Sequence, residues 1–183
     1  MRRLIQGRRT LHEIPAIVLA EITSGYIVGY SRIPGVTALG EIRFAGRDAT
    51  AGSVQQFDAP GTRILFPELP SNMPSRNGAR FLAGLVLLNP QGLLPRTTPV
   101  RAEVKIAILT SAGNEIASTY LTLDAAEQVT RLLFTEGSNP GFFQALDPLA
   151  SHLVVTSDMP IAGSLMIFAD DLTEILAVQG QDF

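Results

Sequence analysis

The sequence predicts an all-β protein: an antiparallel β-sandwich, Ig-like or jelly-roll-like, of one or one and a half tandem units, with one short helix near residues 124–134. Three stretches lead to this class. In residues 100–108 the even positions are apolar and the odd ones begin Arg, Glu, Lys, which is typical of a strand with one buried face. Residues 81–88 are apolar at almost every position, as in a central strand covered on both faces. Residues 111–114 (Ser-Ala-Gly-Asn) favour a hairpin turn.

The order of elements along the chain suggests four parts. Residues 1–13 are basic and form a tail or linker, and residues 14–70 form an N-terminal β unit. The polar stretch 71–78, rich in turn formers, is a linker to a β-sandwich domain at 79–183. Apolar runs between turn residues predict the individual strands, which are residues 14–23, 26–33, 36–45, 53–57, 62–66, 81–88, 100–110, 115–123, 152–156, 160–168 and 172–178.

Residues 124–134 are the ambiguous stretch. Asp124 and Glu127 have the spacing of a helix capping box, and the apolar residues that follow fit one helical face. The competing interpretation is a strand from Gln128 followed by a turn of helix. The pattern favours the helix slightly.

Short internal sequence similarities indicate that the two β units are related. Residues 26–30, followed by a strand and Gly46, resemble residues 160–164, followed by a strand and Gly180. An apolar strand precedes both copies. The order of these features suggests tandem β units, of which the first is partial.

Composition excludes several classes of protein. The net charge of −3 argues against nucleic acid as a partner. The absence of cysteine excludes disulfides and thiolate metal sites. The chain contains no run of about 18 apolar residues, so we expect no membrane-spanning helix. The first residues do not resemble a signal peptide either.

No catalytic constellation is visible, so we expect the protein not to be an enzyme. The two histidines are His12 and His152, and His152 is expected to be a packed or half-exposed residue at the mouth of a strand. Asp158 is expected to cap a turn. Asn89 follows a buried strand, and its amide is expected to satisfy backbone groups of the neighbouring loop.

Two groups of residues are candidates for binding. Asp170, Asp171 and Glu174 form an acidic cluster at an expected hairpin, which is either half of a calcium site or a solvated turn. Phe142 and Phe143 stand together in an expected loop. They are either an exposed contact for a ligand or partner, or a plug at the end of the sandwich core. Calcium is the only cofactor that these residues suggest.

Four stretches resemble a known family. They are residues 64–67 (Ile-Leu-Phe-Pro), residues 83–90 (Ala-Gly-Leu-Val-Leu-Leu-Asn-Pro), residues 108–114 and residues 154–163. Their order resembles that in the β-sandwich modules repeated along exported bacterial surface proteins. The resemblance covers residues 60–180, with 14–50 as the tail of a preceding copy. It implies a secreted or cell-surface structural or adhesive module, and it supplies no catalytic residues.

The leading functional hypothesis is therefore a non-enzymatic structural or adhesion module of an exported or cell-surface bacterial protein, including a filament-type subunit. Its expected partners are neighbouring modules or copies of itself, which would cover open sheet edges by strand pairing. The alternative is a glycan-binding β-sandwich module, assisted by calcium, with a polysaccharide as its partner.

Overall fold

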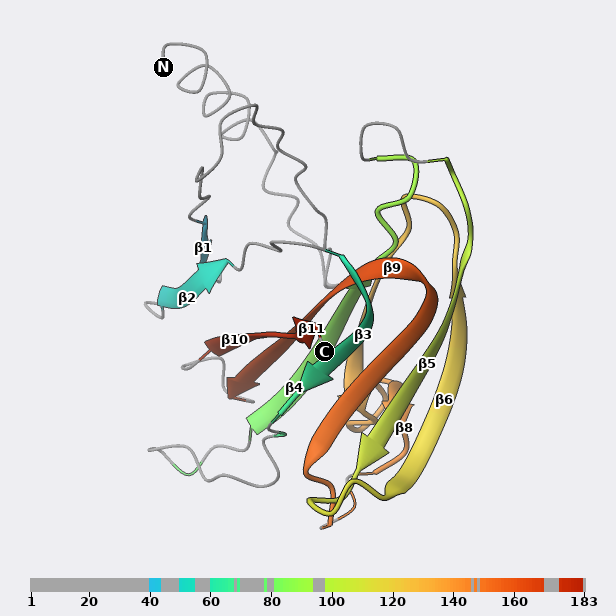
Figure 1. Ribbon diagram of the computed structural model, residues 1–183. Helices are drawn as coiled ribbons and strands as arrows, with labels where there is room; N and C mark the ends of the chain where they lie inside the picture. Colours follow the sequence, from blue (N-terminus) through green and yellow to red (C-terminus); the bar gives the residue numbers. More distant parts are fainter. Residues whose placement is uncertain are drawn as a thin grey trace.

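The computed structural model describes residues 40–43, 50–54, 60–67, 69, 78, 81–93, 98–145, 147, 149–169 and 175–182. Every regular element in these ranges is a β-strand, and the ranges contain no helix (Figure 1). The all-β class is therefore confirmed. The strands are β1 (Gly40–Arg43), β2 (Thr50–Val54), β3 (Gly61–Phe66), β4 (Phe81–Leu88), β5 (Ala102–Leu109), β6 (Glu115–Leu123), β7 (Gln128–Phe134), β8 (Gly141–Phe143), β9 (His152–Ala169), β10 (Ile175–Gln179) and β11 (Gln181–Asp182).

The fold is organised around β9, a strand of 18 residues that pairs with four others. Its first half lies between β3 and β5, and its second half lies between β4 and β10. The sequence predicted two separate strands here, 152–156 and 160–168. One continuous strand forms instead, and it arches from one layer of the molecule to the other (Figure 1).

The strands that flank β9 form one nine-stranded, strongly curved sheet. One side continues from β9 through β5 to β6, and the other continues through β4 and β7 to β8. β6 and β8 approach each other without pairing, so the sheet is nearly barrel-shaped. β1 and β2 form a separate two-stranded sheet, and β2 lies beside β10. The sandwich and the tandem units stay predictions.

The bend in β9 is held by side-chain hydrogen bonds. Asp158 Oδ1 accepts a hydrogen bond of 2.8 Å from the backbone N–H of Glu103, at the start of β5. Ser157 Oγ accepts one of 3.3 Å from the N–H of Met159. The register between β3 and β9 also shifts across this point. Asp158 therefore fixes the corner of β9 to β5.

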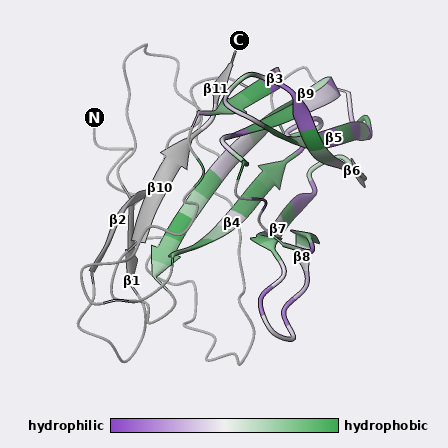
Figure 2. Ribbon diagram, turned by 90° about the horizontal axis from the view of Figure 1, so that it is seen from below, coloured by the Kyte–Doolittle hydropathy of each residue, from purple (hydrophilic) through white to green (hydrophobic). Residues whose placement is uncertain are grey.

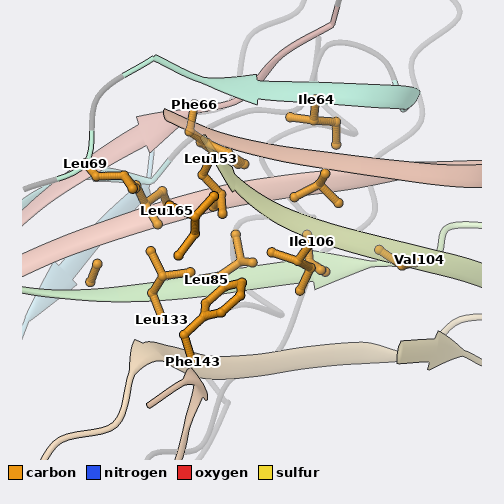
Figure 3. Close-up of a cluster of buried hydrophobic side chains, with 14 of the residues drawn as sticks. Ile64, Phe66, Leu69, Leu85, Val104, Ile106, Leu133, Phe143, Leu153 and Leu165 are labelled. Carbon is orange, nitrogen blue, oxygen red and sulfur yellow. The ribbon is translucent and has the colours of Figure 1, made fainter. Parts of the chain in front are cut away.

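The hydrophobic core lies on the concave side of the curved sheet. Ile64 and Phe66 enter it from β3, while Leu133 and Phe143 enter it from the opposite side (Figure 3). Green, hydrophobic stretches follow β3, β4 and β9 in Figure 2. The largest side chains that are fully buried belong to several strands and are Phe66, Leu85, Leu87, Ile106, Leu123, Leu133, Leu153, Ile161 and Leu165.

Gly163, in the second half of β9, allows this core to pack closely. A Cβ atom placed on Gly163 would lie 3.2 Å from Ile64 Cδ1, 3.3 Å from Leu87 Cδ2 and 3.4 Å from Phe66 Cζ. These distances are tighter than ordinary van der Waals contact. Because glycine has no side chain, Ile64 and Phe66 of β3 can pack directly against the backbone of β9 at this position.

β3 lies on the N-terminal side of the predicted boundary between the two β units. Nevertheless, residues 63–66 pair with Leu153–Thr156 of β9, inside the expected domain 79–183. Most of the predicted linker 71–78 and of the predicted unit 14–70 lies outside the described residues, so the boundaries stay predictions. The described part of the chain places β3 within the sheet of the second unit.

The predicted helix at 124–134 is absent, and the competing strand from Gln128 is the better description. Asp124 and Glu127 do contact each other as a capping box would, since the N–H of Asp124 donates to Glu127 Oε2 at 2.6 Å. The contact closes a turn between β6 and β7 rather than a helix. β7 then pairs with β4, and Leu133 is fully buried. Pairing and burial in the sheet outweigh the local helical pattern.

Ala126 in this turn has a φ of 66°, in the left-handed region that favours glycine. This conformation costs a non-glycine residue about 1–2 kcal/mol. Glycine relieves this strain but also gains conformational entropy in the unfolded chain, which offsets part of the benefit. We therefore expect Ala126→Gly to raise the free energy of unfolding by about 0.5–1 kcal/mol. Urea unfolding would measure the change. Ala125→Gly is the matched control and should be destabilising, because Ala125 lies in the same turn without a positive φ.

Candidate interaction surface

The outer face of the β5–β6 hairpin gathers most of the polar contacts between side chains that the structure describes. The hairpin is closed by a turn in which the N–H of Gly113 donates to Thr110 O at 2.9 Å. The N–H of Asn114 donates to Thr110 Oγ1 at 3.1 Å. Gly113 has a φ of 81°, as expected from the turn predicted at residues 111–114. The hairpin and its turn are therefore confirmed.

Charged residues on this face are matched with partners on the neighbouring strand. Arg101 Nε lies 3.1 Å from Asp124 Oδ1, just beyond the end of β6. One step along, Thr122 Oγ1 donates to Glu103 Oε2 at 2.9 Å. Cross-strand pairs of this kind stabilise a hairpin by modest amounts when they are exposed.

Lys105 and Glu115 form the shortest of these ion pairs, with Nζ and Oε2 2.6 Å apart. Lys105 Nζ also lies 6.0 Å from the centroid of the Tyr120 ring, and the two residues are paired in the register of the hairpin. The hydrogen bond to Glu115 raises the pKa of Lys105. The same bond, followed by one from Ser118, lowers the pKa of Glu115.

These pKa shifts predict how the pair depends on pH. The pKa of Glu115 is lowered in the folded state, so its stabilisation is present above the ordinary value of 4.5 and is lost as pH falls through the folded value. The pKa of Lys105 is raised, so its stabilisation is complete below 10.5 and is lost as pH rises through the folded value. We expect the difference in unfolding free energy between wild type and Glu115→Gln to be small, flat near neutral pH, and smaller at both extremes. Urea unfolding across pH would measure it, and a difference independent of pH would contradict the assignment.

β6 has a free edge. Among the described strands it pairs only with β5, so along one side its backbone groups have no partner strand. Residues 116–123 contain no charged residue, proline or glycine. Ser118, Tyr120 and Thr122 are exposed on the outer face, and the side chain of Tyr120 is 72% exposed. Natural proteins commonly protect edge strands with charges, prolines or bulges. Residues 116–123 of β6 lack the first two of these, and the register with β5 shifts once, between Ala117 and Glu115.

Asn89 is completely buried and fully hydrogen-bonded. Its Nδ2 donates to Val100 O at 2.8 Å and to Leu123 O at 3.1 Å. Its Oδ1 accepts from the N–H of Gln91 at 3.1 Å, and its own N–H donates to Glu127 O at 2.9 Å. The expectation that this amide satisfies loop backbone groups is confirmed. Asn89 joins the end of β4 to the chain segments at the start of β5 and the end of β6.

His152 is the first residue of β9 and is half-buried, as expected. Its Nδ1 lies 2.6 Å from Pro67 O, directly after β3. The carbonyl can only accept, so Nδ1 carries the proton in this contact. The imidazole thus ties the end of β3 to the start of β9. His12 lies outside the described residues.

Phe142 and Phe143 belong to β8 and not to a loop, so their expected location was wrong. The Phe143 side chain is 9% exposed and lies in the core, with its ring centroid 6.2 Å from that of Phe134. Phe142 is half-buried, and the guanidinium of Arg131 lies 5.2 Å from its ring centroid. Phe142 and Phe143 are successive residues of β8, so their rings point to opposite sides of the strand. Contact of either ring with a ligand stays a prediction.

Asp170, Asp171 and Glu174 lie outside the described residues, so the calcium site stays a prediction. In the part of the chain that the structure describes, no three His, Asp or Glu side chains are grouped to hold a metal ion. If the site forms, calcium should raise the melting temperature, because a ligand that binds only the folded state stabilises it. Thermal unfolding with calcium and with a chelator would measure this. An effect that survives in Asp170→Asn/Asp171→Asn would contradict the assignment.

The edge position of β6 does not follow from its residue pattern. Alternation predicts a strand but gives no information on its neighbours in the sheet. The uncharged stretch 116–123 was the available signal. No helix among the described residues is long and apolar enough to cross a membrane.

Comparisons with known proteins give little further information. No family model matches the chain, and no curated protein is significantly similar to it. Among solved structures, the crystal structure of Thermotoga maritima 1070 is similar, with a TM-score of 0.47 and 11% sequence identity. The match covers 68% of this chain and 96% of that one.

Proposed function

We propose that the protein is a non-enzymatic structural module of an exported or cell-surface bacterial assembly, which associates with other modules through its sheet edge. The observation that supports this most strongly is β6, a strand of nine residues with one described neighbour. An open edge presents a row of backbone donors and acceptors that another strand can pair with. The lack of charge and proline in residues 116–123 suits pairing.

The polar residues that sequence reasoning singled out support a structural role as well. Asn89, His152 and Asp158 each hold one part of the chain to another by hydrogen bonds to backbone groups. The Nδ1–H of His152 donates to the carbonyl of Pro67, which ties the end of β3 to the start of β9. The three side chains therefore stabilise the sheet.

Light scattering on a sizing column, with negative-stain microscopy of the same fractions, tests the proposal. We expect defined oligomers or filaments whose mass increases with protein concentration. A monomer at every concentration would contradict assembly through the sheet edge. Hydrolysis of a generic ester panel that is lost in His152→Ala would contradict the non-enzymatic part of the proposal.

A further inference from the structure

We propose that β6 pairs antiparallel with β6 of a second copy of this chain, across a two-fold axis that passes by Tyr120. This inference rests on the proposed function and names the partner and the contact strand. The two sheets would join into one continuous sheet through backbone hydrogen bonds. Because a two-fold interface uses the same surface on both subunits, one strand is sufficient to form it.

Pairing along the whole edge of β6 needs a partner strand of similar length. β6 has nine residues, whereas the edge strands β8 and β11 have three and two. β8 lies near β6 but does not hydrogen-bond to it. β10, with five residues, already lies beside β2. Among the described strands, β6 of a second copy is therefore the partner that pairs the greatest length of this edge.

Pairing of β6 with a second β6 places no like charges opposite each other along residues 116–123. With Tyr120 on the axis, Ser118 faces Thr122 of the second copy. Residues 116–123 carry no charge. The nearest acidic groups are already matched within each molecule, Glu115 by its bond to Lys105 and Asp124 by its bond to Arg101. Like charges directly opposite would destabilise the pair, and this register avoids them.

Self-pairing also covers the most exposed large hydrophobic side chain among the described strands. Tyr120 is 72% exposed. A two-fold axis perpendicular to the sheet keeps the outer faces on the same side, so the two Tyr120 rings would lie next to each other. Aromatic cross-strand pairs stabilise antiparallel strands. Each ring would also keep its own Lys105 ammonium group nearby.

The charge test uses Tyr120→Lys in the full chain, with Ser111→Lys as the matched control. In Tyr120→Lys, two new ammonium groups face each other across the axis, and each is close to Lys105. Ser111 is exposed in the hairpin turn, away from the edge, so its variant adds the same charge elsewhere. We expect Tyr120→Lys to weaken dimerisation about tenfold or more by light scattering, and Ser111→Lys to leave it unchanged. Equal behaviour of the two variants would overturn the inference.

The second test is disulfide formation, because the chain has no cysteine of its own. Two cysteines at position 120 would face each other across the axis, within the Cα separation that a disulfide can span. We expect Tyr120→Cys to give a cross-linked dimer under mild oxidation and Ser111→Cys to remain monomeric on denaturing gels. If the wild type assembles but Tyr120→Lys does not weaken assembly and Tyr120→Cys does not cross-link, the proposed β6 contact is wrong and the proposed function is retained. If wild type is monomeric at all concentrations, both proposals fail.

Discussion

Replacing Asn89 by alanine is expected to lower the free energy of unfolding by about 3 kcal/mol or more. The substitution removes two bonds donated by Nδ2, to Val100 O and Leu123 O, and one accepted by Oδ1 from Gln91. Asn89 is completely buried, so its former partners would lose their hydrogen bonds with little access to water. An unsatisfied buried group costs about 1–3 kcal/mol. Urea unfolding followed by circular dichroism would measure the loss.

Asn139→Ala is the matched control. Asn139 is exposed in the turn before β8, and its backbone exchanges hydrogen bonds with that of Glu136, which alanine retains. We expect its effect to be about 0.5 kcal/mol or less. A loss below about 1 kcal/mol for Asn89→Ala would show that Asn89 does not hold the three segments together.

Replacing Phe66 by alanine is expected to cost about 3–5 kcal/mol. Phe66 is completely buried, and its ring lies over the space left by Gly163. Removing it would open a cavity between β3 and the second half of β9, because the strands around it cannot collapse freely. The same unfolding measurement applies, with the midpoint and the denaturant slope fitted separately.

Phe142→Ala makes the same chemical change at a half-buried position. Its ring packs at the margin of the core, with Arg131 above it, so a much smaller loss is expected. If both variants lost similar amounts, β3 would not be an integral strand of the core. A large difference would place Phe66 inside the cooperative unit that contains β9, although the predicted domain boundary separated them.

The sequence predicts the hairpin best, for a clear physical reason. β5 has one buried and one exposed face along much of its length, and side-chain alternation records that environment directly. β4 is bounded as expected because it is buried on both faces over most of its length. The turn at Gly113 is equally local, since glycine supplies its positive φ.

The errors concern features that depend on distant parts of the chain. The Asp124–Glu127 contact forms, but pairing of β7 with β4 decides that a turn and strand follow. The chain around Met159 resembles a loop between two strands, yet pairing with β3 and β5 on either side keeps β9 continuous. A local sequence pattern contains no information on which distant strand will pair with it.

The candidate surface was predictable only in part. The hydrogen bonds of Asn89 follow from its chemistry at the end of a buried strand, where an amide must find partners. The edge position of β6 could not be predicted, because strand order is not encoded in alternation. Phe143 lies in β8 rather than in the expected loop, and its burial agrees with the expected alternative of a plug in the core.

Hydrogen exchange of the β6 amides at low and high protein concentration tests whether the molecules assemble through β6. In an antiparallel edge strand, alternate N–H groups point away from the sheet and exchange rapidly unless another strand pairs with them. We predict that these amides of β6 become protected as concentration rises, while those of the turn at Gly113 stay unchanged. Rapid exchange at every concentration would contradict assembly through β6.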